Sequence, residues 1–184
     1  MALRDKNKKY RIDGERLYLR IIMQSDKSEK YLSWLNDDEV QRFTRRRGKK
    51  FVMRDVEEFL ASAVSSDDFH FGIFLNAADR HIGNISLNLI DEKNMSAEIS
   101  IMIGDRSVWG SGYAKDAIRL LTSFAFEELR LHRLWAESPN EAFNRLMRTL
   151  GWTKEGMRRE AFQVDGTYTD LTCWSLLTNE YATE

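Results

Sequence analysis

The sequence predicts an α+β protein with a central, mostly antiparallel sheet flanked by helices. Three observations lead to this class. Apolar residues alternate with polar ones in successive short segments between 69 and 103, apolar residues recur at helical spacing before and after that block, and two further apolar segments surround a turn at Asp165-Gly166. One strand, two helices, three antiparallel strands, a helix, a strand, a helix and a final hairpin form a mixed α+β plan.

Each expected element follows from a local pattern. Residues 1–14 are polar and basic, which predicts a flexible N-terminal arm ahead of a single domain over 15–184. Strands are expected where apolar and polar residues alternate, and helices where apolar residues recur every three or four positions. In chain order these are a strand at 16–22, helices at 26–36 and 54–65, strands at 69–75, 81–90 and 97–103, a helix at 113–128, a strand at 133–137, a helix at 141–150 and strands at 153–162 and 169–177.

Particular residues set the boundaries of these elements. The turn-rich segment 76–79 should join its two flanking strands into an antiparallel hairpin. Ala117, Leu121 and Phe124 mark the helix face that packs on the sheet. Asn140 is the expected N-cap of the helix that begins at residue 141.

Composition limits the classes of protein that the chain can be. Its 184 residues are 42% hydrophobic, which is enough for one core without disulfides or metals. With 28 basic and 29 acidic residues the net charge is −1, so direct nucleic-acid binding is not expected. A single cysteine, Cys173, and the lack of a long apolar run predict a cytoplasmic protein without a membrane span. Monomer and homodimer are both open as its oligomeric state. No Cys or His residues have metal-ligand spacing, so no metal is expected.

The segment 108–114, Val-Trp-Gly-Ser-Gly-Tyr-Ala, is typical of a phosphate-binding turn. Gly110 and Gly112 stand where an alternating segment gives way to a helical one, and glycines there let the backbone bend and expose N–H groups at the positive end of the helix dipole. A nicotinamide fingerprint would need a third glycine and a parallel strand. The sequence therefore favours the pyrophosphate of coenzyme A.

Two motifs together resemble the GCN5-related N-acetyltransferase (GNAT) family. Segment 109–114 is similar to its signature (Gln or Arg)-x-x-Gly-x-(Gly or Ala), with Gly112 and Ala114 in register. Segment 138–152 is similar to its second signature, an Asn-led helix ending in Gly-aromatic. The resemblance extends from Arg16 to about Leu177, and is closest to the branch with ribosomal-protein alanine, spermidine and aminosugar acetyltransferases.

The resemblance implies a fold and a set of coenzyme contacts. In this family the sheet splays beside the strand that carries Ile101 and Met102, and the pantetheine arm of acetyl-CoA fills the gap. Acetyl-CoA is thus the expected cosubstrate. The residues expected to bind it are Ile101, Met102, Ile103, Trp109, Gly110, Ser111, Gly112, Tyr113, Ala114 and Asn140.

Glu98 is the candidate catalytic base. Amine acetylation needs the amine proton removed near pH 7, and the family commonly places a Glu in this strand. A carboxylate facing the cleft could have a raised pKa. The alternative is that Glu98 is a solvated strand residue paired with an arginine across the sheet.

The usual general acids of the family are missing. Relatives use a Tyr or a Ser at fixed offsets from the signature Asn, but Met147 and Phe143 occupy those positions. Tyr113, Tyr168 or water could protonate the leaving thiolate, or no acid is used, because a thiol with a pKa near 8.5 leaves tolerably as thiolate.

A basic run at 42–51 suggests the nature of the acceptor. Arg45, Arg46 and Arg47 fall in a connection that overhangs the acceptor end in this fold, and His70 could line the same side. This charge favours a nucleotide-linked aminosugar over a polyamine as the small-molecule acceptor. A protein N-terminus remains an alternative acceptor, and a non-catalytic coenzyme A-binding sensor or interaction module remains an alternative function.

Overall fold

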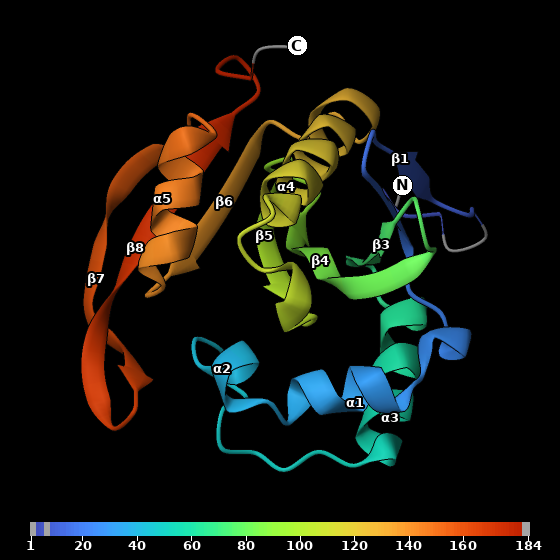
Figure 1. The fold of residues 1–184 in the computed structure, drawn as a ribbon. Helices are drawn as coiled ribbons and strands as arrows, with labels where there is room; N and C mark the ends of the chain where they lie inside the picture. Colours follow the sequence, from blue (N-terminus) through green and yellow to red (C-terminus); the bar gives the residue numbers. More distant parts are fainter. Residues whose placement is uncertain (1–2, 6–7, 182–184) are drawn as a thin grey trace.

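The structure, a computed structural model, describes residues 3–5 and 8–181, and in that part of the chain eight strands form one sheet (Figure 1). The strand order is β1-β2-β3-β4-β5-β6-β8-β7, and every neighbouring pair is antiparallel except β5 and β6. The strands are β1 (Arg11–Asp13), β2 (Leu17–Ile21), β3 (Phe69–Leu75), β4 (Arg80–Asp91), β5 (Ser96–Ile103), β6 (Arg133–Ser138), β7 (Thr153–Val164) and β8 (Thr167–Leu177). The helical elements are η1 (Gln24–Asp26), α1 (Glu29–Leu35), α2 (Asp38–Gln41), α3 (Met53–Ser65), η2 (Arg106–Val108), α4 (Tyr113–Ser123), η3 (Phe124–Glu128) and α5 (Glu141–Thr149). The predicted α+β class is confirmed.

Local capping explains where the helices differ from the sequence prediction. The helix predicted at 26–36 begins at Glu29 as α1, because the Ser28 hydroxyl accepts a hydrogen bond from the Tyr31 amide at 3.1 Å and caps it. The short element η1 precedes it and ends at Asp26. The sequence does not predict α2, whose four residues are too few to show a period. Its first turn is capped by Asp37, which accepts hydrogen bonds from the amides of Glu39 and Val40.

The N-terminal segment differs from the flexible arm expected over 1–14. Residues 11–13 form β1 at the edge of the sheet, and the Tyr10 ring packs edge-on against Phe69 and Phe124. Arg4 is buried, and its guanidinium donates hydrogen bonds to carbonyls at the end of α3, among them Ala63 at 3.0 Å. These contacts hold the described part of the segment on the fold, while residues 1–2 and 6–7 lie outside the described residues.

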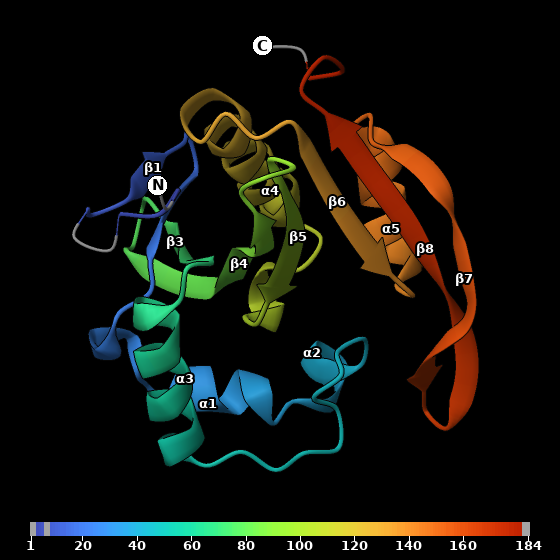
Figure 2. The same cartoon turned by 180° about the vertical axis from the view of Figure 1, so that it is seen from behind.

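Buried apolar side chains gather in two clusters. The larger lies between the sheet and the two helices that cover one of its faces, α4 and α5, which stand in front of the strands in Figure 1 and behind them in Figure 2. The smaller joins Ile22 to α1, α2 and α3 through Tyr31, Val40 and Leu60. In both views these three helices lie at the end of the sheet toward which β5 and β6 run.

The sheet splays between its two parallel strands. β5 and β6 pair only through Ser96, Ala97 and Glu98 of β5, although β5 continues to Ile103 and β6 to Ser138. Beyond Glu98 the two strands separate, and α2 lies below the gap in Figure 1. The splay implied by the family resemblance is therefore present, and it leaves the edge of β5 from 99 to 103 without a strand partner on that side.

Candidate functional site

The glycine turn is a left-handed bend at the start of α4. Gly110 and Gly112 have φ of 78° and 84°, and Gly112 is the N-cap of the helix. Only glycine adopts these angles without a steric penalty. A Cβ added to Gly112 would lie 3.2 Å from Nη2 of Arg16. The turn thus presents bare backbone at a helix N-terminus, where unpaired N–H groups favour an anion.

Arg16 braces this turn from the end of the sheet. Its guanidinium donates to the Ser111 carbonyl at 3.0 Å and to the Asp116 carboxylate at 2.7 Å, and it lies 4.7 Å from the centre of the Tyr113 ring. Sequence reasoning takes Arg16 only as the start of a strand. The contact spans 95 positions of the chain, so no local pattern signals it.

The turn opens onto a cavity of about 640 Å³, here named the turn cavity. It crosses the splay, because its lining includes residues of β5, the turn, α5 and the loop before α5. Ser111 is absent from the lining, and its carbonyl is turned to Arg16. The predicted coenzyme residues that line it are Ile101, Met102, Ile103, Trp109, Gly110, Gly112, Tyr113, Ala114 and Asn140.

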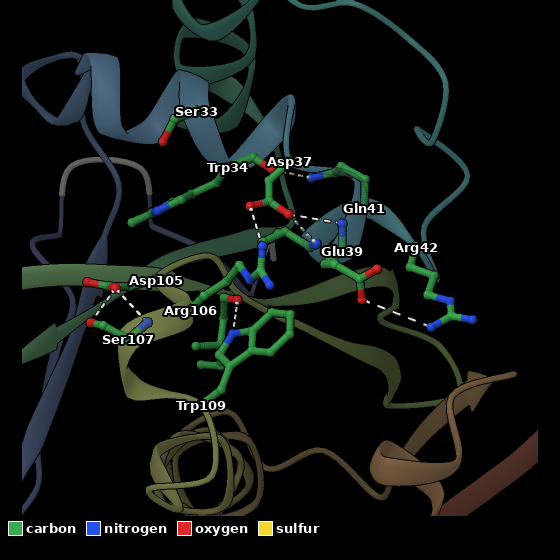
Figure 3. A network of polar contacts seen from close by, with 12 residues as sticks. Ser33, Trp34, Asp37, Glu39, Gln41, Arg42, Asp105, Arg106, Ser107 and Trp109 are labelled. Atoms are coloured by element: carbon green, nitrogen blue, oxygen red, sulfur yellow. Dashed lines mark hydrogen bonds and ion pairs between the residues drawn. The ribbon is translucent and has the colours of Figure 1, made fainter.

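Asn140 and Trp109 have clear structural roles at this cavity. The Asn140 side chain accepts a hydrogen bond from the Ala142 amide at 2.9 Å, which is the predicted N-cap of α5. Trp109 stands where the family signature has Gln or Arg, and its indole N–H donates to the Ile103 carbonyl at 2.9 Å. This bond ties the turn to the end of the splayed strand (Figure 3).

A polar network joins the segment just before the turn to α1 and α2. Arg106, just before the turn, lies 3.3 Å from the Asp37 carboxylate that caps α2, as Figure 3 shows. Asp105 is buried and pairs with Lys30 of α1 at 2.6 Å, which contributes to a lowered pKa for that carboxyl against the effect of burial. Ser107 donates to the same carboxylate at 2.7 Å. The helical layer is therefore fixed to the turn through charged contacts.

A second cavity of about 380 Å³ lies over the sheet on the other side of the splay and is named the Glu98 cavity. Its floor is the polar face of three strands, where His70 of β3, Ser86 of β4 and Ser100 of β5 lie opposite one another. The His70 ring contacts the Ser86 hydroxyl at 3.1 Å, and burial lowers the pKa of His70. Both cavities are lined by Phe43, Thr44, Ile101, Met102, Ser138 and Phe143, so they meet at the splay.

Glu98 is the last β5 residue paired with β6, and it lines the Glu98 cavity. Burial raises its pKa, and the negative charge of Glu137 raises it further. The Asn88 side chain on β4 and the charge of Arg45 act in the opposite direction. Within the part of the chain that is described, Glu98 forms no ion pair with an arginine or lysine. A half-buried carboxylate with a raised pKa at a cavity wall is able to accept a proton.

The arginines of the basic run take different positions. Arg45 and Arg46 line the Glu98 cavity together with His70, whereas Arg47 does not. Arg47 and Arg42 both pair with Asp165 at the tip of the β7–β8 hairpin, Arg42 at 3.6 Å. Of the three arginines predicted to face an acceptor, Arg47 is therefore the one that lies outside the lining of the Glu98 cavity, paired with a carboxylate of the hairpin tip.

Glu137 is a cavity residue that sequence reasoning missed. It accepts a hydrogen bond from Arg158 of β7 at 2.7 Å and lies 3.8 Å from Arg45. It follows Trp135 by two positions, and Trp135 is the partner of Glu98, so Glu137 and Glu98 lie on one face of the sheet. Alternation along β6 indicates from the sequence that Trp135 and Glu137 share a face. That this face is also the face of Glu98 follows only from the pairing of β5 with β6.

The four residues considered in connection with the general acid lie in different surroundings. Met147 is fully buried in the larger cluster, and Phe143 lines both cavities. Tyr113 lines the turn cavity. Tyr168 is 65% exposed on the hairpin and lines neither cavity. Of the two tyrosines, Tyr113 is thus the one placed near the turn.

Two properties of the described residues bear on the class of protein. None of their helices is both long enough and apolar enough to cross a bilayer. Among them, three or more His, Cys, Asp or Glu side chains do not gather in a way that could hold a metal ion.

Comparisons with known proteins agree with this geometry. The family model described as "Acetyltransferase (GNAT) domain" matches residues 16–153. The chain is 36% identical over 114 residues to "Uncharacterized N-acetyltransferase p20" of Bacillus licheniformis, over 61% of this chain and 64% of that protein, which is under two thirds of its length. It is 28% identical over 174 residues to "Probable N-acetyltransferase YjcK" of Bacillus subtilis (strain 168), over 90% of this chain and 96% of the relative.

A solved structure shows the same fold. The spermidine N-acetyltransferase of Vibrio cholerae, in complex with CoA and spermine, superposes with a TM-score of 0.81 at 21% identity, covering 91% of this chain and 98% of that one. The family model covers most of the chain, from before β2 to the start of β7, including the glycine turn and the splay. The chain therefore belongs to the GNAT family of acetyl-CoA-dependent N-acetyltransferases.

Proposed function

We propose that the protein transfers an acetyl group directly from acetyl-CoA to a primary amine bound in the Glu98 cavity. The observation that carries this proposal is the meeting of the two cavities at the splay, with Glu98 at the last paired position before the strands separate. The acceptor that we favour is a nucleotide-linked aminosugar, because Arg45 and Arg46 line the cavity that holds Glu98.

The turn cavity fits coenzyme A. Its glycines have positive φ, a Cβ at Gly112 would approach Arg16, and the N-terminus of α4 offers unpaired N–H groups to a pyrophosphate. The edge of β5 beyond Glu98 has no strand partner and can bond an extended arm. When bound, acetyl-CoA supplies an acetyl group activated as a thioester.

The residues of the Glu98 cavity prepare the amine. An alkyl ammonium has a pKa of about 10.4, so the amine needs a proton acceptor near pH 7. Glu98 takes that proton, and its raised pKa brings its proton affinity closer to that of the amine. The freed lone pair then attacks the thioester carbonyl, and the C–S bond breaks to release the thiolate. Tyr113 or water returns a proton to the sulfur.

An acceptor screen with acetyl-CoA tests the proposal. Thiol release is followed with nucleotide-linked aminosugars, peptides with free N-termini and polyamines at equal concentrations. Turnover is expected with the aminosugar nucleotides. Preferred turnover of peptides would replace the proposed acceptor with a protein N-terminus. Coenzyme binding without turnover of any amine would make the protein a coenzyme A sensor instead.

A further inference from the structure

The positive charges of the basic run are not equivalent. Arg42 and Arg47 pair with Asp165, and Arg45 pairs with Glu137. Arg46 is exposed, lines the Glu98 cavity and, among the described residues, forms no ion pair. Its guanidinium lies over an aromatic ring, 5.4 Å from the centre of the Phe59 ring of α3. Arg46 is therefore the guanidinium of this run that remains able to take an anionic ligand.

Arg46 and Glu98 lie at different ends of the Glu98 cavity. Phe59, which carries Arg46 on its face, contacts the His70 ring edge-on at a centroid distance of 5.9 Å. His70 is on β3 and Glu98 on β5, with β4 between them. Neighbouring strands are about 4.8 Å apart, so these backbones are separated by roughly 10 Å. The end of the cavity at Arg46 is thus about two strand spacings, roughly 10 Å, from the end at Glu98.

The two ends of the cavity differ in charge. Glu98 and Glu137 supply the negative end, and Arg158 and Arg45 offset part of the charge of Glu137. At the other end Arg46 supplies the positive charge, and burial lowers the pKa of His70, which disfavours a second positive charge there. A ligand complementary to this cavity carries an amine at one end and an anionic group at the other.

We infer that Arg46 binds a phosphate group of the acceptor, and that the acceptor class is an amine with a phosphate ester or pyrophosphate roughly 10 Å away. This inference rests on the proposed function, because it assumes that the amine lies at Glu98. A guanidinium forms two parallel hydrogen bonds to a phosphate, which fixes the orientation of the ligand as well as its affinity. Arg46 thereby determines specificity, while Arg42 and Arg47 hold the loop to the hairpin tip.

Matched acceptors and variants test this role. The acceptors are a nucleotide-linked aminosugar, the same aminosugar without phosphate, and a tripeptide with acidic side chains. The variants are Arg46→Gln, Arg46→Lys and the control Arg54→Gln, which removes an equal charge from an exposed position on α3. Arg46→Gln should raise the KM of the phosphate-bearing acceptor about tenfold, since a hydrogen bond to a charged group is typically worth that much. The KM of acetyl-CoA and of the phosphate-free aminosugar should stay within about twofold, and Arg46→Lys should fall between.

Direct binding separates failure of the inference from failure of the proposed function. Calorimetry measures the Kd of the nucleotide-linked aminosugar for each variant without acetyl-CoA. Turnover with an unchanged Kd and KM in Arg46→Gln would overturn the inference and leave the function standing. Weakened binding in Arg46→Gln, in a protein that acetylates no amine, would support the phosphate site and overturn the function. Arg46-dependent turnover of the acidic tripeptide alone, or no binding of the nucleotide by the parent protein, would also overturn the inference.

Discussion

The two cavities that meet at the splay are built differently. The turn cavity surrounds a glycine turn at the start of α4 and the splayed end of β5, and residues of α2, the loop after it and α5 complete its lining. The Glu98 cavity is lined by residues from the loop after α2, from α3 and α5, and from the six strands β3 to β8. Charged contacts between distant segments, such as Arg45 with Glu137, hold the second cavity together.

The difference teaches which end of the molecule can vary. The glycine turn depends on the positive φ angles of two glycines rather than on particular side chains. The Glu98 cavity depends on the charge and shape of its side chains. Under the proposed function, the turn cavity therefore holds the cosubstrate, and substitutions in the Glu98 cavity change the choice of acceptor.

The largest effect is expected for Glu98→Gln, which tests whether turnover depends on a carboxylate in the Glu98 cavity. The amide keeps the size of the side chain but cannot take a proton, so turnover near pH 7 should fall on the order of a hundredfold while the Kd of acetyl-CoA is unchanged. Because the pKa of Glu98 is raised, the acid limb of the parent pH–rate profile should lie higher than for an ordinary carboxylate, and the variant should lack that limb. Activity within a few-fold of the parent would give Glu98 a structural role.

The same substitution has an opposite effect on stability. A raised pKa in the folded state means that the ionised form of Glu98 opposes folding, so its contribution to stability is present at acid pH and is lost as pH rises through that pKa. Glu98→Gln should therefore unfold at an equal or higher temperature than the parent at pH 8. The exposed control Glu58→Gln should show neither the loss of turnover nor this pH-dependent gain.

A larger side chain at Gly112 tests whether the turn cavity binds coenzyme A. Gly112→Val should weaken acetyl-CoA binding about tenfold or more, because it places a Cβ in the bend and against Arg16. Gly151→Val is the matched control, since Gly151 has a similar φ of 77° and open space around it but does not line the turn cavity. Calorimetry with coenzyme A measures both. Equal affinities for the two folded variants would remove the turn from the coenzyme site.

The smallest effect is expected at the hairpin tip. Asp165→Asn removes the carboxylate that pairs with Arg42 and Arg47, and exposed ion pairs contribute only about 0.2–1 kcal/mol. The KM of an anionic acceptor should fall about two- to threefold at low salt, because the mouth of the cavity becomes more positive, and that change should vanish near 1 M salt. Asp13→Asn, at an exposed ion pair of β1, is the control. An unchanged KM for the anionic acceptor at low salt would contradict this effect of the hairpin tip.

The sequence predicted what is local and missed what is distant. The strands of the β3–β4 hairpin were predicted to within one residue of their ends, and Asn140 was predicted as the N-cap of α5, because period and capping chemistry depend on consecutive residues. The helix predicted over 113–128 corresponds to α4 followed by η3. β1 was missed, since three residues with a single apolar side chain show no alternation. Asp165 could not be found at all, because it meets Arg47 only when the hairpin and the loop after α2 are brought together. The catalytic and acceptor roles of the site residues stay predictions.

The position of Arg4 has a consequence for shortened forms of the protein. Its guanidinium satisfies carbonyls in the last turn of α3, and Phe59 of the cavity wall belongs to the same helix. Deleting residues 1–9 would leave those carbonyls without their donor and the end of the helix free to fray. Amide hydrogen exchange should then quicken over 60–66 long before global unfolding is affected. Removal of this N-terminal segment would thereby loosen the wall of the Glu98 cavity that Phe59 forms, although Arg4 and Phe59 are more than fifty positions apart in the chain.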